Sequence, residues 1–180
     1  FYLANVINKP SFASIFIVIA ATLYFYATSL KQSLLIGNFI VALLLSFSVI
    51  IIGIFDLYPI TNLENQSIMG LLFRILLDYA IFAFVINFIR EIVKDLQDYE
   101  GDLSQGMNTL PIAFGVNRTS KLVFGLSFIP IICIVYYINT NLFASGLVYA
   151  TLYGLVFILA PLLYFSIKMC MKLPTSIYHT

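Results

Sequence analysis

The chain has 180 residues, of which 62% are hydrophobic and 9% are charged, and its formal net charge is +1. Soluble domains carry roughly 25% charged residues, so this composition excludes a water-soluble globular protein. The nine Lys and Arg residues are balanced by eight Asp and Glu residues and form no basic stripe, which argues against a nucleic-acid partner.

Long uncharged runs predict helices that cross a membrane, because about 20 apolar residues span a hydrocarbon core of roughly 30 Å. Residues 1–7 have the character of a helix end, and Asn8-Lys9-Pro10 follows as a turn. We expect the full spans at 12–29, 34–55, 70–90, 121–138 and 143–167. The polar sequence Asn139-Thr140-Asn141 predicts the hairpin between the last two spans. The fold class that follows is all-α, a polytopic transmembrane helical bundle.

The positive charges are distributed unevenly between the two faces of the expected bundle. Alternating crossings place the loops 29–33 and 91–120 and the tail from residue 168 on one side of the membrane. Seven of the nine Lys and Arg residues lie on that side: Lys31, Arg90, Lys94, Arg118, Lys121, Lys168 and Lys172. Cytoplasmic loops carry the excess of Lys and Arg. The sequence therefore predicts an integral, multi-pass membrane protein with the acidic loop 91–120 on the cytoplasmic face.

Arg74 and Asp78 lie four residues apart within the third expected span, on one face of its helix. A carboxylate inside a membrane is costly and is usually paired. One interpretation is a mutual ion pair near the outer interface. The other interpretation is a contact between Asp78 and a substrate.

The densest charge in the chain is the segment 90–102, which holds five of the eight acidic residues. Four of them fall at i, i+4, i+7 and i+11 and so share one face of a helix: Glu91, Asp95, Asp98 and Asp102. Like charges four residues apart repel each other. This acidic stripe therefore requires a counter-cation at the end of a membrane helix.

The residue types of the segment suit a divalent metal bound together with a phosphate. Mg²⁺ typically takes one or two protein carboxylates and completes its coordination with phosphate oxygens and water. Arg90 and Lys94 stand beside the acids, and guanidinium and ammonium groups bind phosphate. The alternative is a solvated loop whose charges only face water.

Glycine and proline residues occur at the end of the acidic segment and after it, at Gly101, Gly106, Thr109-Leu110-Pro111 and Gly115. Glycines of this kind end a helix, and the proline restarts the chain toward the next span. The pattern predicts a helix end, a short connection and a new helix directly after the acidic stripe.

These residues together resemble the second aspartate-rich motif of the UbiA-type intramembrane prenyltransferases. The matching positions are Arg90-Glu91, Lys94-Asp95, Asp98-Tyr99-Glu100-Gly101-Asp102, Gly106, Thr109-Leu110-Pro111 and Gly115. Upstream, the sequences at 26–31 and 37–38 resemble the family's loop between its fourth and fifth helices. The resemblance covers the whole chain, which corresponds to the end of helix three through helix eight.

The resemblance implies a nine-helix bundle around a membrane-open cavity, in which Mg²⁺ and two aspartate-rich motifs hold a prenyl diphosphate. Its ionisation would yield an allylic cation that alkylates an aromatic ring or, in some branches, a glycerol-phosphate hydroxyl. The form Arg90-Glu91-Ile92-Val93-Lys94-Asp95 favours the glycerol-phosphate branch. The expected partners are thus a prenyl diphosphate, a small acceptor and the lipid bilayer.

Roles in the site follow from the matching positions. The resemblance implies that Asp98 and Asp102 bind Mg²⁺ and that Asp95 is a third catalytic carboxylate.

The resemblance also implies that three basic residues bind the diphosphate: Arg90, Lys94 and Lys31. It places Tyr26 in the lining of the pocket. Two of these positions also fit a purely structural role, because Lys31 suits an anchor on the positive-inside face and Tyr26 suits an aromatic residue at the membrane interface.

The chain departs from the family pattern at one point. The family's first aspartate-rich motif is absent, because Asp56 and Glu64 fall on the other face of the membrane. Either the chain is a fragment of a longer protein, or it is an inactive relative of the family. We expect residues 1–180 to be a single prenyltransferase-like domain that is truncated at both ends.

Two other functions compete with the enzyme. A transporter or channel subunit would need polar groups lining a path near the middle of the membrane. A non-catalytic membrane scaffold would use the acidic loop to bind a partner. Mg²⁺-dependent binding of a prenyl diphosphate distinguishes the enzyme from both.

Overall fold

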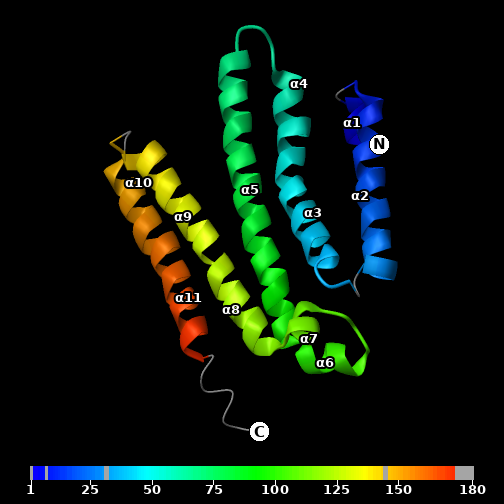
Figure 1. The fold of residues 1–180 in the computed structure, drawn as a ribbon. Helices are drawn as coiled ribbons and strands as arrows, with labels where there is room; N and C mark the ends of the chain where they lie inside the picture. Colours follow the sequence, from blue (N-terminus) through cyan, green and yellow to red (C-terminus); the bar gives the residue numbers. More distant parts are fainter. Residues whose placement is uncertain (1, 7, 31–32, 144–145, 173–180) are drawn as a thin grey trace. The chain divides into compact units, whose positions relative to one another are not determined.

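The computed structural model describes residues 2–6, 8–30, 33–143 and 146–172, and Figure 1 shows their helices. The chain divides into two compact units, Phe1–Glu91 and Ile92–Thr180. The expectation that both belong to one domain stays a prediction.

Helices dominate both units, and no strand occurs among the described residues. Five of the helical stretches are long and apolar enough to cross a membrane: Pro10–Leu30, Ile36–Ile60, Gln66–Gln97, Val116–Phe143 and Val148–Lys168. The predicted all-α class and the number of spans are confirmed. The second, third and fourth stretches end five to seven residues beyond the predicted ends, and the second and fifth begin two and five residues later than predicted. Apolar composition does not mark where a helix leaves the hydrocarbon.

In the first unit, the elements in chain order are α1 (Tyr2–Val6), η1 (Pro10–Phe12), α2 (Ala13–Phe25), η2 (Tyr26–Leu30), α3 (Ile36–Ile52), η3 (Gly53–Leu57), α4 (Tyr58–Ile60) and α5 (Gln66–Gln97), which runs a few residues into the second unit. In the second unit they are α6 (Tyr99–Ser104), α7 (Leu110–Phe114), α8 (Val116–Leu126), α9 (Phe128–Tyr137), η4 (Ile138–Phe143), α10 (Val148–Tyr153), η5 (Gly154–Leu159) and α11 (Ala160–Lys172).

Small side chains hold the first unit together. The buried face of α3 and η3 carries Asn38, Ala42, Ser46 and Gly53 at helical spacing. A Cβ atom on Gly53 would lie 2.7 Å from the ring of Phe73 on α5, so the two helices approach closely there. Small residues at interfaces are the usual means by which membrane helices pack. The outward faces remain apolar, as in helices that face lipid.

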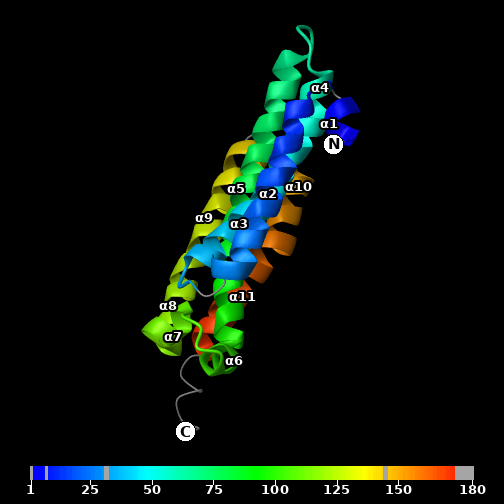
Figure 2. The ribbon, with the colours of Figure 1, turned by 90° about the vertical axis from the view of Figure 1, so that its right-hand side faces the viewer.

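Aromatic rings fill the remaining contacts of the first unit. Phe16 on α2 packs against Phe55, with ring centroids 5.4 Å apart. Phe39 on α3 meets Phe84 of α5 edge to face at 5.2 Å. The helices α2, α3 and α5 thus follow one another as neighbours, each antiparallel to the last (Figures 1 and 2).

In the second unit, α8 and α9 form one stretch that is interrupted at Ser127, three residues before Pro130. Proline has no N–H for the carbonyl one turn earlier, which accounts for the interruption. The predicted hairpin at Asn139-Thr140-Asn141 is wrong, because η4 stays helical through Phe143. The chain turns later, where Gly146 adopts a φ of +70°. Its N–H reaches the carbonyl of Phe143, a pattern that closes a helix on glycine.

Helix α5 determines where the charged segment lies. It has 32 residues, which at about 1.5 Å per residue is roughly 48 Å, well beyond a hydrocarbon core of about 30 Å. The uncharged stretch 79–89 ends at Arg90, so the last turns extend past the apolar part of the helix.

Arg74 and Asp78 both lie on the exposed surface of α5, and no ion pair joins them. The ion-pair interpretation is therefore wrong. The order of the two charges contributes to this, because an acidic residue on the N-terminal side of a basic one gives the better i, i+4 pair. Contact between Asp78 and a substrate stays a hypothesis.

Candidate functional site

The acidic stripe runs from the end of α5 into α6. A break in the backbone occurs at Asp98, which has φ of −91° and ψ of 8° and precedes α6. The helical hydrogen bonds nevertheless continue across it. The N–H of Asp98 donates to the carbonyl of Lys94, and that of Asp102 donates to the carbonyl of Asp98, each at 2.9 Å. Asp98 and Asp102 therefore occupy successive turns, as their spacing predicts.

Two neighbouring rows of charge run along the end of α5. The basic row is exposed and consists of Arg90 and Lys94, one turn apart. The acidic row beside it is more enclosed: Glu91 is 7% exposed and Asp95 is half-buried. Basic and acidic side chains so arranged offer groups for a phosphate and for a metal on adjacent strips of the same helix.

The glycines after the stripe behave as predicted at Gly106, which ends α6. It adopts a φ of +66°, its N–H reaches the carbonyl of Leu103, and the N–H of Met107 reaches the carbonyl of Asp102 at 3.0 Å. This pair of bonds is a Schellman closure. It folds the chain back beside Asp102. Gly101 differs from the expectation, because it lies inside α6 instead of ending it.

Pro111 restarts the chain as predicted and lies in the first turn of α7. Thr109 occupies the N-cap position and is 4% exposed, yet its Oγ1 atom has no hydrogen-bond partner among the described residues. Pro111 has no N–H, and the N–H of Ile112 donates to the backbone carbonyl of Thr109 at 3.1 Å. The first turn therefore leaves no amide for the hydroxyl. Nothing in the sequence pattern indicated this buried group.

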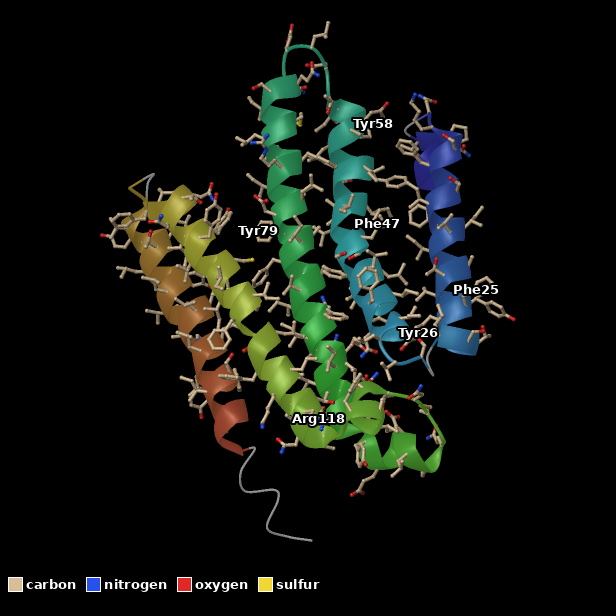
Figure 3. All side chains as sticks on the ribbon, viewed as in Figure 1. Phe25, Tyr26, Phe47, Tyr58, Tyr79 and Arg118 are labelled. Atoms are coloured by element: carbon tan, nitrogen blue, oxygen red, sulfur yellow. The ribbon has the colours of Figure 1, made fainter. Side chains whose placement is uncertain are left out.

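In the first unit, Tyr26 is half-buried at the end of α2, next to the start of α3 (Figure 3). A Cβ atom on Gly37 would lie 3.3 Å from the Tyr26 ring and 2.7 Å from the carbonyl oxygen of Leu30. Glycine at this position thus lets α3 begin directly against the end of α2. Lys31, which was expected to bind diphosphate, lies outside the described residues.

The structure gathers part of the predicted site on one continuous segment. Asp95, Asp98 and Asp102 follow Lys94 on consecutive turns in the second unit. Arg90 lies one turn before Lys94 on the same helix. Tyr26 belongs to the first unit and to a different helix.

Asp98 and Asp102 are suitable ligands for a magnesium ion whose other ligands come from a substrate. The described residues hold no cluster of three or more His, Cys, Asp or Glu side chains that could enclose a metal. Asp98 and Asp102 supply two carboxylates from successive turns. Mg²⁺ is typically bound by one or two protein carboxylates, while phosphate oxygens and water fill its remaining coordination positions.

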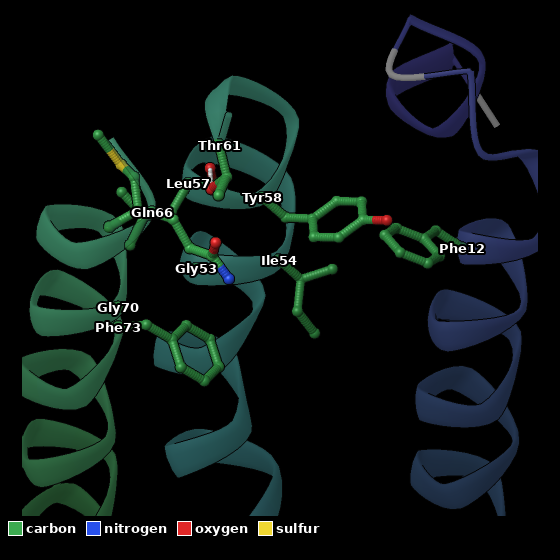
Figure 4. Close-up of a pocket in the computed structure, with 10 residues that line it drawn as sticks. Phe12, Gly53, Ile54, Leu57, Tyr58, Thr61, Gln66, Gly70 and Phe73 are labelled. Atoms are coloured by element: carbon green, nitrogen blue, oxygen red, sulfur yellow. Dashed lines mark hydrogen bonds between the residues drawn. The ribbon is translucent and has the colours of Figure 1, made fainter. Parts of the chain in front are cut away.

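An apolar pocket lies at the opposite end of α5, within the first unit (Figure 4). It measures about 340 Å³ and is lined by Phe12, Gly53, Ile54, Leu57, Tyr58, Thr61, Gln66, Met69, Gly70 and Phe73. The Tyr58 and Phe12 rings lie with their centroids 5.8 Å apart and their planes tilted by 49°. No acidic or basic side chain lines this pocket, so it offers no group for a metal or a phosphate.

Comparison with known proteins identifies the family of this chain. A model of the UbiA prenyltransferase family matches residues 1–172. The chain belongs to this family. Its membership and its five long apolar helices make it an integral, multi-pass membrane protein, as predicted.

Several relatives carry the name digeranylgeranylglyceryl phosphate synthase. The one from Korarchaeum cryptofilum is 32% identical over 149 residues, which cover 83% of this chain and 47% of that protein. The one from Thermococcus sibiricus is 38% identical over 100 residues, or 56% of this chain and 31% of the relative. The one from Methanosphaera stadtmanae is 30% identical over 141 residues, or 77% and 44%. The chain thus spans less than half the length of these relatives. No solved structure matches it.

Proposed function

We propose that this UbiA-family protein transfers a prenyl group from a prenyl diphosphate to a hydroxyl of a glycerol-phosphate acceptor in the membrane. Family membership supports the prenyl transfer. The relatives named digeranylgeranylglyceryl phosphate synthase support the choice of a glycerol-phosphate acceptor over an aromatic one. The observation that carries the proposal is the pair Asp98 and Asp102 on successive turns beside the basic row of α5.

Each predicted residue has a role in this proposal. Asp98 and Asp102 would hold Mg²⁺, and Asp95 would act as a further catalytic carboxylate one turn earlier on α5. Bound Mg²⁺ would neutralise the negative charge that develops on the departing diphosphate.

The basic side chains of Arg90, Lys94 and Lys31 would bind the diphosphate oxygens. Cationic groups fixed in this way stabilise the leaving group without reorganising during the reaction. Tyr26 would line the cavity that holds the prenyl substrate, where an aromatic face stabilises a nearby cation. The proposal also places the loop 91–120 in the cytoplasm, where soluble prenyl diphosphates reach the site.

The test is Mg²⁺-dependent binding and turnover by the complete gene product in detergent. Radiolabelled geranylgeranyl diphosphate is supplied with a panel of acceptors that includes a geranylgeranylglyceryl phosphate and an aromatic acid, across a Mg²⁺ titration. We expect Mg²⁺-dependent labelling of the glycerol phosphate only. Labelling of the aromatic acid alone would replace the proposed acceptor. The absence of both binding and transfer would support the scaffold instead.

A further inference from the structure

A positively charged face lies at the start of α8, apart from the site described above (Figure 3). Arg118 and Lys121 are three residues apart, so they share one side of this helix, and both are exposed. The other side of α8 carries the buried residues Thr119, Ser120 and Val123. Its neighbours in the second unit are α7, α9 and α11. Arg118 and Lys121 therefore point away from the packed side of the helix.

The helices around this face contribute no negative charge. Residues 103–180 contain no Asp or Glu, and their basic residues are Arg118, Lys121, Lys168 and Lys172. No ion pair joins Arg118 or Lys121 to another residue that the structure describes. Like charges one turn apart repel each other. An external partner with a negative charge would remove this repulsion.

The length of the helical stretch places the two cations in the headgroup layer of a membrane. The stretch Val116–Phe143 has 28 residues, and its last 22 residues, 122–143, carry no charge. At about 1.5 Å per residue these 22 residues extend roughly 33 Å, close to the hydrocarbon core of about 30 Å. Arg118 and Lys121 come just before them, at the level of the lipid phosphates.

The neighbouring helix α11 marks the same level, because it ends beside the start of α8 (Figures 1 and 2). Lys121 precedes the turn at Gly146 by 25 residues and Lys168 follows it by 22, so their heights differ by less than about one helical turn. The Nζ atom of Lys168 lies 5.5 Å from the centre of the Tyr164 ring. Tyrosine and lysine at a helix end are typical of the interface between membrane and water.

The charged face continues into an exposed apolar strip. Gly125, Phe128 and Ile132 follow Lys121 at intervals of four, three and four residues, so they lie on the same side of the helix. Phe128 is 45% exposed and Ile132 is 64% exposed. A Cβ atom on Gly125 would meet nothing within 4 Å, so the surface between the cations and Phe128 is open. This order of groups matches a phospholipid, with its headgroup at the cations and its chain along the strip.

We propose that this face of α8 and α9 binds an anionic lipid of the bilayer. The guanidinium of Arg118 and the ammonium of Lys121 donate hydrogen bonds to the headgroup phosphate. One hydrocarbon chain lies over Gly125 and extends toward Ile132. A headgroup with net negative charge is preferred over a zwitterionic one, because each basic residue near the membrane surface contributes about 1 kcal/mol, or about fivefold in affinity. The lipid takes no part in prenyl transfer.

The test measures lipid selectivity at this face with the complete gene product in nanodiscs of phosphatidylcholine. Ile132→Cys carries a fluorophore, in a background without Cys133 and Cys170. This position is 11 residues beyond Lys121, roughly 17 Å along the helix, a depth that the middle of a lipid chain reaches. Quenching is compared between phosphatidylglycerol and phosphatidylcholine that are brominated in mid-chain. We expect phosphatidylglycerol to bind about 25-fold more tightly, which is fivefold for each basic residue.

Three double variants show whether the two cations cause this selectivity. Arg118→Gln with Lys121→Gln should abolish the preference for phosphatidylglycerol. Lys9→Gln with Arg74→Gln is the matched control, because it also removes two exposed basic residues, both from the first unit. This control should keep the wild-type preference. Arg118→Lys with Lys121→Arg preserves both charges and should keep most of it.

Several outcomes would overturn the inference. Equal quenching by the two lipids in the wild type shows that the face does not select anionic lipid. Equal losses in the two glutamine variants show a general effect of surface charge, and a complete loss in the charge-preserving variant shows a disturbed fold. Displacement of the brominated phosphatidylglycerol by prenyl diphosphate or by glycerol 3-phosphate would assign Arg118 and Lys121 to a substrate site.

Prenyl transfer is measured on the same samples, so that the two proposals fail separately. A wild type with selective quenching but without transfer contradicts only the proposed function. A wild type that is active but shows no selective quenching contradicts only the lipid site. The glutamine variant of Arg118 and Lys121 should keep kcat within about threefold of the wild type, because neither residue has a role in the proposed reaction.

Discussion

Asp98 and Asp102 place two negative charges on successive turns of the chain. Asp98→Asn and Asp102→Asn change the packing little, because the amide is nearly the same size as the carboxylate. Each should lower prenyl transfer by about 10²–10³-fold, the loss typical of one electrostatic group at a reacting centre. Turnover measured across a Mg²⁺ titration checks this, and extra Mg²⁺ should restore part of the rate. The exposed variant Gln97→Glu is the control and should have little effect. Normal activity of Asp98→Asn at low Mg²⁺ would contradict the metal role.

Thr109 buries a hydroxyl that has no partner among the described residues. Thr109→Val keeps the shape of the side chain and removes the unpaired oxygen. We expect the free energy of unfolding to rise by about 1 kcal/mol, since an unsatisfied buried polar group costs about 1–3 kcal/mol. Thermal unfolding in detergent measures the change, with Thr109→Ser as the comparison that retains the hydroxyl. Destabilisation of Thr109→Val relative to Thr109→Ser would show that the hydroxyl does have a partner, such as an ordered water.

At the level of single residues, some positions could be predicted from the sequence and others could not. The turn-to-turn relation of Asp98 and Asp102 was predictable, because it depends only on local helix geometry. The contrast between buried Glu91 and exposed Lys94 was not. Burial depends on which neighbouring element covers each side of the helix, and the spacing of charges along one helix carries no information on that. The missing Arg74–Asp78 ion pair has a similar origin, since spacing permits a pair without specifying rotamers.

At the scale of elements, the end of α6 depends on the left-handed backbone of Gly106. Gly106→Ala should destabilise the connection between α6 and α7 by about 1–2 kcal/mol, the cost of a left-handed conformation for a residue with a Cβ. Because Met107 bonds to the carbonyl of Asp102, the variant should also raise the Mg²⁺ concentration at half-maximal turnover. Thermal unfolding of the purified protein measures the loss of stability, and turnover across a Mg²⁺ titration measures the half-maximal Mg²⁺ concentration.

Gly101→Ala is the matched control for this element. Gly101 lies inside α6, and a Cβ atom there meets nothing within 4 Å. Alanine in a helix interior is favoured over glycine by roughly 0.5–1 kcal/mol, so this variant should be neutral or stabilising. Equal effects of the two substitutions would show that the left-handed closure at Gly106 is not what holds the connection.

The junction between α2 and α3 depends on a close approach at Gly37. A Cβ atom there would lie 2.7 Å from the carbonyl oxygen of Leu30, a backbone atom that cannot rotate away. Gly37→Ala should therefore destabilise the protein by about 1–3 kcal/mol, as overpacking does. Gly70→Ala in α5, where nothing lies within 4 Å, should not. Thermal unfolding of the two variants tests this prediction. A Gly37→Ala variant as stable as the wild type would show that the backbone at the junction shifts to accommodate the added Cβ atom.

The residue pattern predicts that a helix exists better than it predicts where the helix ends. The five spans were predictable from the length of predominantly apolar runs. The turn between the last two was not, because polar Asn139-Thr140-Asn141 stays within the helix and the chain turns near Gly146. Side-chain hydrogen bonds contribute to this, since Thr140 Oγ1 donates to the carbonyl of Tyr136 at 2.9 Å and is satisfied within the helix. A polar residue marks a turn only when the helix offers it no acceptor.

At the scale of the whole molecule, the charge asymmetry predicts which face meets the cytoplasm. Five spans place Gln32, Asp102 and Lys172 on one side, with Glu64 and Asn141 toward the other. Gln32 lies outside the described residues. Asn141 lies within η4, so the exposed positions Glu64 and Ser104 serve best as reporters. Single cysteines at these two positions, in a background without Cys133 and Cys170, are probed with an impermeant thiol reagent in intact cells.

We expect Glu64→Cys to react in intact cells and Ser104→Cys only after the cells are permeabilised. The predicted crossings would place seven of the nine Lys and Arg residues on the side of Ser104, and an excess of these residues in short loops keeps a face in the cytoplasm. The site on α5 and α6 depends on this orientation, since a charged diphosphate would have to cross the bilayer to reach an external stripe. Labelling of Ser104→Cys from outside would overturn both the orientation and the cytoplasmic delivery of the substrate. If Glu64→Cys and Ser104→Cys are both labelled from outside, the two positions lie on the same side of the membrane. In that case α5, which lies between them, does not cross it.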